Sequence, residues 1–352
     1  MDRQKITESK CESANMSSKN TKQAHMSKKT TGKVRRSKLF SHLKDAAARL
    51  NAATKGPRRA LYAIRRLRWL AQAASAAVSN GYLAGFARMK IYSGATKRFC
   101  VPGLNCYSCP GALFACPLGS LQAELASGEV RLPLYTLGFL FAFGAVLGRF
   151  VCGWLCPFGL VQDLIYKIPA PKKLRRLPGD RGLVMLRYLL LALLCILLPL
   201  TVVNIVGQGS PWFCKVVCPA GTLGAGLPLV LFGEGYADAA GIWFAIKVST
   251  LVVILVLAAL TYRPFCRYLC PLGAIYGLFN PISLVRLKFD RGKCISCGAC
   301  ERVCKLNISP HLTPGSTECI RCGDCVAVCP TRALYGLPRA GGQKGRVQEA
   351  GK

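Results

Sequence analysis

CGWLCPFG (residues 152–159) and CRYLCPLG (residues 266–273) are two copies of one motif, Cys-x-x-x-Cys-Pro-x-Gly. Each copy closes a long apolar run, Leu134–Val151 in the first case and Ile242–Tyr262 in the second. A helix needs about 20 apolar residues to cross a bilayer. The repeated motif therefore predicts two membrane helices that each end in a pair of thiols on the same side of the membrane.

The spacing of these thiols predicts a metal site. Residues four apart lie on one face of a helix, so Cys152 pairs with Cys156, and Cys266 with Cys270, if helical geometry continues through them. Two facing pairs make a four-thiolate site, which we name the inner site. The proline is expected to stop the helix, and Pro-x-Gly to turn the chain over the site.

Composition supports a membrane protein. The 352 residues are 52% hydrophobic, yet the formal net charge is +33, and Lys and Arg crowd the first 68 residues. Two further spans are predicted at Trp69–Ala87 and Tyr188–Val206. Basic residues gather in the N-terminal region and after the second and fourth spans, which places both termini in the cytoplasm. The predicted fold class is mainly α: about four transmembrane helices, followed by an α+β module.

The predicted division has four parts: a disordered basic tail (1–65), a transmembrane domain (66–285), a two-cluster module (286–336) and a second disordered tail (337–352). Met16 and Met26 are alternative candidate starts, and no secretory signal is recognised near the N-terminus. The three histidines all lie outside the apolar segments. The chain therefore offers no histidine pair for a membrane haem, and it has no C-x-x-C-H motif for covalent haem.

The C-terminal module carries the most specific motif. CISCGACERVC (294–304) and CIRCGDCVAVCP (319–330) both have the spacing C-x2-C-x2-C-x3-C. This is the run of bacterial two-cluster ferredoxins, in which the fourth cysteine of each run binds the other [4Fe–4S] cluster. The alternative, structural zinc, favours paired knuckles. Module site 1 is then predicted as Cys294, Cys297, Cys300 and Cys329, and module site 2 as Cys319, Cys322, Cys325 and Cys304.

A further set of thiols is predicted on the outer side. CKVVCPAG (214–221) is a third copy of the motif and follows the third span, and the loop 100–119 ends in another Cys-Pro-x-Gly. We expect an outer site of four ligands drawn from Cys214, Cys218, Cys106, Cys109 and Cys116. Disulfides are the alternative in an oxidising compartment. Cys100 is the least certain outer cysteine to assign, and Cys195 is expected to pack as a small hydrophobe.

With these motifs, residues 65–335 resemble the NapH/NosR-type membrane polyferredoxins. The resemblance implies electron transfer between a cytoplasmic or quinol donor and an extracytoplasmic redox partner, with a separate flavoprotein reductase as the expected acceptor. Ser93–Thr96 also resembles the SGAT sequence at which FMN is attached to threonine. Four common residues recur by chance, so a plain loop, not covalent FMN at Thr96, is predicted. The expected partners are thus membrane lipid and redox proteins, without nucleic acid.

Two other functions stay open at this point. One is the reduction of a metal or quinone substrate at the outer site, and the other is redox sensing by an assembly or regulatory protein. No Walker A motif or hydrolytic constellation is recognised. One or two clusters at the repeated motifs, beyond the two in the module, are the expected cofactors. A helix of about 18 residues is roughly 27 Å long, so the step between the two membrane sides is not explained by the sequence.

Overall fold

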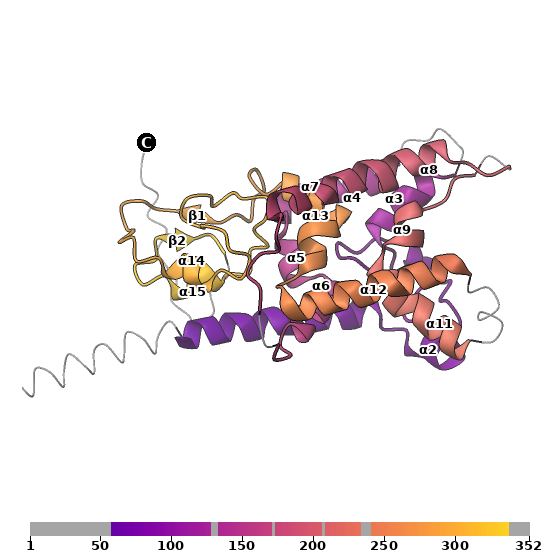
Figure 1. Ribbon diagram of the computed structural model, residues 1–352, viewed down its shortest axis with the longest axis horizontal. Helices are drawn as coiled ribbons and strands as arrows, with labels where there is room; N and C mark the ends of the chain where they lie inside the picture. The colour runs from indigo at the N-terminus through magenta and orange to yellow at the C-terminus, as the bar shows by residue number, and fades with distance from the viewer. Residues whose placement is uncertain (1–57, 128–132, 171–172, 206–207, 234–240, 338–352) are drawn as a thin grey trace, which may run out of the picture. The chain divides into compact units, whose positions relative to one another are not determined.

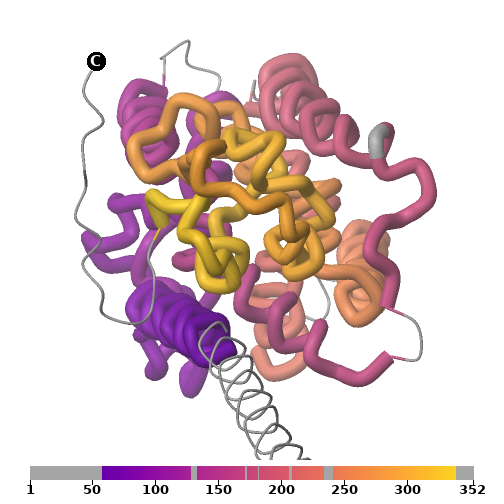
Figure 2. Tube along the Cα trace, turned by 90° about the vertical axis from the view of Figure 1, so that its left-hand side faces the viewer, coloured from indigo at the N-terminus to yellow at the C-terminus, as the bar shows by residue number. Residues whose placement is uncertain are grey.

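The structure is a computed structural model that describes residues 58–127, 133–170, 173–205, 208–233 and 241–337. The described residues from 59 onward belong to one compact unit. Helices dominate, and the C-terminal module lies at one end of them, beside α5 and α13 (Figure 1). Viewed from that end, the module lies in front of the helices (Figure 2). Residues 1–57 and 338–352, predicted as disordered tails, lie outside the described residues.

Two helices are long and apolar enough to cross a membrane. One runs through α7 (Asp180–Leu190), the π-helical turn η2 (Leu191–Leu197) and α8 (Leu198–Thr201). Its apolar part, Gly182–Thr201, has a mean hydropathy of 2.5. The other is α12 (Ile242–Leu260), with a mean hydropathy of 2.4. The third predicted span therefore begins six residues earlier than expected, and the fourth matches its expected start.

The other two predicted spans are not single long helices. The second is α4 (Leu134–Leu147), which ends at Gly148 with a φ of +51°, before α5 (Phe150–Trp154) begins. In place of Trp69–Ala87 the chain forms a helix over residues 58–79, breaks at Asn80 and Gly81, and continues as α2 (Leu83–Arg88). The Asn-Gly pair explains this break, because both residues favour turns over helix interiors.

The predicted N-terminal tail also extends too far. Residues 58–65 are helical, and Arg65 Nη2 lies 2.9 Å from Asp324 Oδ2 in the C-terminal module. The helix over 58–79 thus contacts the module, which gives the basic residues at its start a structural partner. Sequence composition alone did not reveal that acidic partner, because it lies 259 residues away along the chain.

Short helices start at each Cys-Pro-x-Gly motif. They are α3 (Pro117–Leu125), α6 (Pro157–Ile165), α10 (Pro219–Gly221) and α13 (Pro271–Leu278). In all four, the cysteine is the N-cap residue with extended backbone and the proline is the first helical residue. The predicted helix through Cys152 and Cys156 is therefore wrong. The proline begins a helix here, because its fixed φ and missing N–H suit the first turn.

The remaining turns position the cysteine motifs. Two further π-helical turns lie at them, η3 (Thr222–Gly226) after Cys218 and η4 (Phe265–Leu269) around Cys266. Such turns are rare and are frequent at functional sites. The other short elements are the 3-10 turn η1 (Ala95–Arg98), α9 (Trp212–Val216) and α11 (Leu227–Phe232).

The C-terminal module is small and loop-rich. Strand β1 (Lys288–Phe289) pairs antiparallel with β2 (Leu334–Tyr335), with Phe289 opposite Leu334. Two single-turn helices, α14 (Ala299–Val303) and α15 (Asp324–Val328), pack together. Gly298 and Gly323 precede them with φ values of +66° and +83°, a conformation that glycine adopts without steric cost. The two cysteine runs thus have the same local geometry.

A buried ion pair joins the two repeated motifs. Arg263 Nε and Nη2 donate to the Asp163 carboxylate at 2.8 and 2.6 Å. Burial alone raises the pKa of Asp163, but Arg263, its hydrogen bonds and Arg68 lower it from 3.8 to about 2. Asp163 therefore stabilises the fold above about pH 4, and this contribution is lost as the pH falls toward 2.

Replacing Arg263 should show how much this ion pair contributes to the free energy of unfolding. The variant Arg263→Leu leaves the Asp163 charge buried with only Arg68, at 3.4 Å, and should lower the free energy of unfolding by about 3–5 kcal/mol at pH 7. Thermal unfolding in detergent micelles measures this. Lys293→Leu, which removes the exposed partner of Asp290, serves as the control and should change little. Equal loss in both variants would contradict a special role for the buried pair.

Candidate metal centres

The predicted cysteine sets gather around four cavities. Module site 1 has its four predicted cysteines around one cavity with Phe289 and His311, and module site 2 has its four around another. The fourth cysteine of each run lies with the opposite run, as the crossed pattern predicted. Backbone amides approach these sulfurs, with Ser296 N–H donating to Cys294 Sγ at 3.4 Å.

The inner site is enclosed in the core of the helical part. Cys152, Cys156, Cys266 and Cys270 line one small cavity together with Leu104, Phe158 and Phe265. All four cysteines are buried, and the Gly273 N–H donates to Cys270 Sγ at 3.3 Å. The two cysteine pairs predicted from the motifs therefore lie around the same cavity. Within each motif, a break between two helices separates the two cysteines.

Four of the five cysteines expected at the outer site lie together around one cavity. Cys106, Cys116, Cys214 and Cys218 line a cavity of about 420 Å³ that also contains Tyr107, Lys215 and Lys247. Cys109 packs instead with Ala112, Ala225 and Leu229. Cys100 lies apart, with its Sγ 3.6 Å from Ser120 Oγ, and Cys195 is fully buried in η2. None of the described cysteines forms a disulfide.

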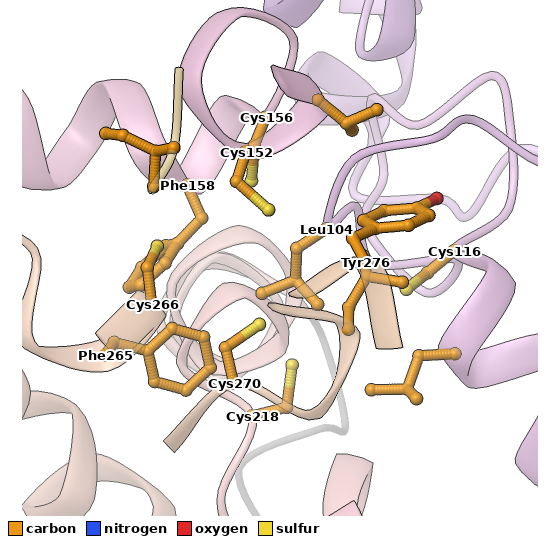
Figure 3. Close-up of a cluster of buried hydrophobic side chains, with 14 of the residues drawn as sticks. Leu104, Cys116, Cys152, Cys156, Phe158, Cys218, Phe265, Cys266, Cys270 and Tyr276 are labelled. Carbon is orange, nitrogen blue, oxygen red and sulfur yellow. The ribbon is translucent and has the colours of Figure 1, made fainter. Parts of the chain in front are cut away.

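One residue lies between the inner and outer sites. Leu104 lines both cavities, and Figure 3 shows its side chain between the inner cysteines and Cys116 and Cys218. The loop 100–106 therefore reaches into the helical core, where the Tyr276 hydroxyl donates to Pro102 O at 3.0 Å. The sequence had assigned this loop to the outer surface, and the signal for its burial is weak, since only Val101, Pro102 and Leu104 are apolar.

Module site 2 is similarly close to the inner site. Ile320 lines the cavity of module site 2 and belongs to the same buried cluster as Cys152 and Cys266. Gly153 faces the Ile320 carbonyl oxygen at a position where a Cβ atom would overlap it. Within the module, Cys300 and Cys325 pack in one cluster and join the two module sites. The four cysteine sites thus form a continuous series through the described part of the chain.

Two buried arginines hold the inner site, and the sequence analysis missed their role. Arg149 Nη2 donates to the carbonyl oxygen of Cys266 at 2.6 Å, and Arg263 Nη1 donates to that of Cys152 at 2.5 Å. Each arginine stands three residues before the first cysteine of its own motif and contacts the other motif. The shared pattern R-x-x-C-x-x-x-C-P-x-G in RFVCGWLCPFG and RPFCRYLCPLG was the available signal.

The donor sets fit iron–sulfur clusters. In a cubane each thiolate binds a different iron, so the sulfurs surround the cluster and do not meet at one point. Among the described residues, no three His, Cys, Asp or Glu side chains are grouped closely enough to hold a single metal ion. Burial raises the pKa of the Cys266 thiol to about 11 and that of Cys322 to about 12. Thiolates are the metal ligands, so loading these sites releases protons.

The hydroxyl group of Thr96, in the segment that resembles an FMN attachment sequence, makes hydrogen-bond contacts within the protein. Thr96 Oγ1 donates to the carbonyl oxygen of Leu113 at 2.9 Å and lies 3.2 Å from the Tyr92 hydroxyl, within hydrogen-bond distance. The plain loop predicted from the sequence at Thr96 stays a prediction.

Comparison with known protein families identifies the cysteine regions. A 4Fe-4S binding domain model matches residues 132–178, 186–229 and 243–291, and a second 4Fe-4S binding domain model matches residues 287–308 and 316–335. The methylamine utilization ferredoxin-type protein MauN of Paracoccus denitrificans is 31% identical over 68% of this chain and 74% of its own length. The chain belongs to the NapH/NosR-type polyferredoxin family.

Other relatives support this polyferredoxin assignment. The ferredoxin-type protein NapH of Haemophilus influenzae is 34% identical over 49% of this chain and 53% of its own. An uncharacterized protein of Methanocaldococcus jannaschii is 30% identical over 54% of this chain, which spans 65% of that relative. No solved structure matches. These relatives support iron–sulfur electron transfer and an association with the membrane, at the level that their names share.

Proposed function

We propose that this polyferredoxin conducts single electrons between the two faces of a membrane along its four cysteine sites. The observation that carries the proposal is Leu104, which lines the inner and outer cavities at once. When bound, [4Fe–4S] clusters supply one-electron chemistry. The chain's part is to hold the thiolates of four such clusters, to exclude water from the inner site, and to keep neighbouring sites in contact through single side chains.

The proposed topology places the C-terminal module and both termini in the cytoplasm. The two apolar helices α7–α8 and α12 support spanning, and α4 and the helix over 58–79 would be the partial third and fourth elements. The basic segments next to the module would attract an acidic electron donor such as a reduced ferredoxin or flavodoxin. Quinol is the alternative donor. The outer site would serve an extracytoplasmic flavoprotein or reductase.

Proteoliposomes test this function directly. With the module facing outward, external dithionite should bleach ferricyanide trapped inside, and the rate should depend on the amount of protein. Cys218→Ser should lower that rate at least tenfold, because it removes one outer ligand, while dithionite still bleaches the module clusters. Cys195→Ser, a buried cysteine outside the four cavities, is the control and should retain the rate. Equal rates in the Cys218→Ser and wild-type proteins would contradict the proposal.

The outer cavity favours one second candidate, a reductase that acts on a small molecule. At about 420 Å³ it is larger than the cavity of module site 1, at about 170 Å³, and it is lined by Lys215 and Lys247. Room beside the cysteines would admit a substrate. The two candidates differ in one measurement: a reductase turns over a quinone with saturable kinetics as an isolated chain, whereas a conduit without its protein acceptor reduces a non-specific oxidant such as ferricyanide and shows no saturation with quinone.

A further inference from the structure

Two buried glutamines occupy equivalent places at the inner and outer sites. The sequences CPLGSLQ (116–122) and CPFGLVQ (156–162) place a glutamine six residues after the Cys-Pro cysteine. Gln162 Nε2 donates to Cys266 Sγ at 3.1 Å, and Gln122 Nε2 donates to Cys214 Sγ at 3.5 Å. In each case the acceptor is the first cysteine of the opposite C-x-x-x-C motif.

The equivalence extends beyond the sulfur contact. Each amide also donates to the carbonyl oxygen four residues earlier in its own helix, that of Phe158 at 3.5 Å for Gln162 and that of Leu118 at 3.2 Å for Gln122. Both glutamines have no exposed surface. The two sites are therefore built on one plan, in which one helix provides a cysteine and an amide donor and the other provides the cysteine that receives the hydrogen bond.

Packing alone does not explain Gln162. Its Oε1 has no hydrogen-bond partner among the described residues, and a buried polar atom without a partner costs about 1–3 kcal/mol. A leucine of similar size would avoid that cost. Gln72 Oε1 has no partner among the described residues either, and Gln122 Oε1 accepts from the Phe213 N–H at 3.1 Å. The feature that distinguishes Gln162 and Gln122 is therefore the N–H directed at a ligand sulfur, which indicates a role at the metal centre.

We propose that Gln162 and Gln122 are positioning residues that raise the reduction potentials of the clusters at the inner and outer sites. The proposal rests on the proposed function, because it requires clusters at both sites. Reduction adds negative charge to the cluster and its thiolates, so an N–H donor stabilises the reduced form more than the oxidised form. Removing the donor should shift the potential of that one cluster to a more negative value.

The inner and outer sites differ in the charged residues around them. Arg149 and Arg263 flank the inner cysteines, whereas the lysines Lys215 and Lys247 line the outer cavity. The glutamine is thus a side-chain donor that the two sites share, and it can be changed at one site without altering the charged residues around the other. This allows one cluster to be addressed at a time.

The experiment is an EPR-monitored redox titration of full-length protein in detergent micelles, with iron counted per chain. Gln162→Leu should shift one midpoint potential negatively, Gln122→Leu a different one, and the double variant both, with wild-type iron content. Gln72→Leu is the matched control, since this buried glutamine donates to the Gly153 carbonyl oxygen at 2.9 Å and to no sulfur. It should leave every potential unchanged.

Each other outcome counts against the inference. Unshifted potentials in both variants would overturn it, and so would the same shift in Gln72→Leu. A loss of about four irons in Gln162→Leu would overturn it too, because the glutamine would then be needed for assembly. A wild-type content of about eight irons would overturn the proposed function along with it, whereas about sixteen irons with unshifted potentials would overturn this inference alone.

Discussion

The Cys152→Ala/Cys266→Ala double variant should hold about four fewer irons per chain than the wild-type protein, which should hold about sixteen. Both thiols line the enclosed inner cavity, one from each repeated motif. Two of four ligands would be lost in a cavity that offers no other thiol, so the cluster would not assemble. Iron and acid-labile sulfide are measured on protein purified anaerobically in detergent.

The same variant should interrupt electron transfer across the membrane without affecting the module. Cys294, Cys297, Cys300 and Cys329 lie around a separate cavity, so the reduced-cluster EPR signal of the module should persist. Cys100→Ala is a suitable control, because Cys100 lies outside the four cavities and only approaches Ser120. An unchanged content of about eight irons in both proteins would confine the clusters to the module.

The second large effect is expected from Gly153→Ala. A Cβ atom at this position would overlap the Ile320 carbonyl oxygen, and that backbone belongs to the run that holds module site 2. Alanine favours a helix by about 1 kcal/mol over glycine, so propensity alone predicts a more stable protein. Contact with a rigid backbone should outweigh this gain and cost about 1–3 kcal/mol, while it moves module site 2 away from the inner site.

Two measurements check this substitution. The melting temperature of Gly153→Ala should fall. The rate of electron transfer from the module to the inner site should also drop, while the module and the inner site both keep their iron. Gly138→Ala is the matched control, since no atom lies within 4 Å of the Cβ it would introduce in α4. If Gly153→Ala matched that control in both stability and rate, the close approach between the inner site and the module would not matter for function.

Local spacing was enough to group most of the cysteines. The run C-x2-C-x2-C-x3-C places three cysteines of each module site within a few residues, and the known crossed pattern takes the fourth from the other run. The sequence therefore predicted the members of both module sites, and the structure gathers those same residues around two cavities. The repeated Cys-x-x-x-Cys-Pro-x-Gly motif predicted the inner group in the same way. Its backbone was predicted wrongly, because proline was taken as the end of a helix when it starts one.

Contacts between distant segments could not be predicted in this way. The choice of Cys106 and Cys116 over Cys109 depends on how the loop 100–119 folds against α10 and η3. Arg149 and Arg263 each donate a hydrogen bond to the motif that the other precedes, and the bonded residues are more than 100 positions apart in the sequence. Neither follows from periodicity, which reports only which residues share a face of one helix.

The sequence by itself determined the spacing of the cysteines in their motifs, the long apolar segments and the clusters of basic residues. These are local properties, since spacing and hydropathy act over a few turns of chain. Only the tertiary structure decided that the loop around Leu104 enters the helical core and that Ile320 packs beside the inner site. The physical reason is that burial is satisfied by whichever segments fit together, so the contacts that join the four cysteine sites arise only once the whole chain is packed.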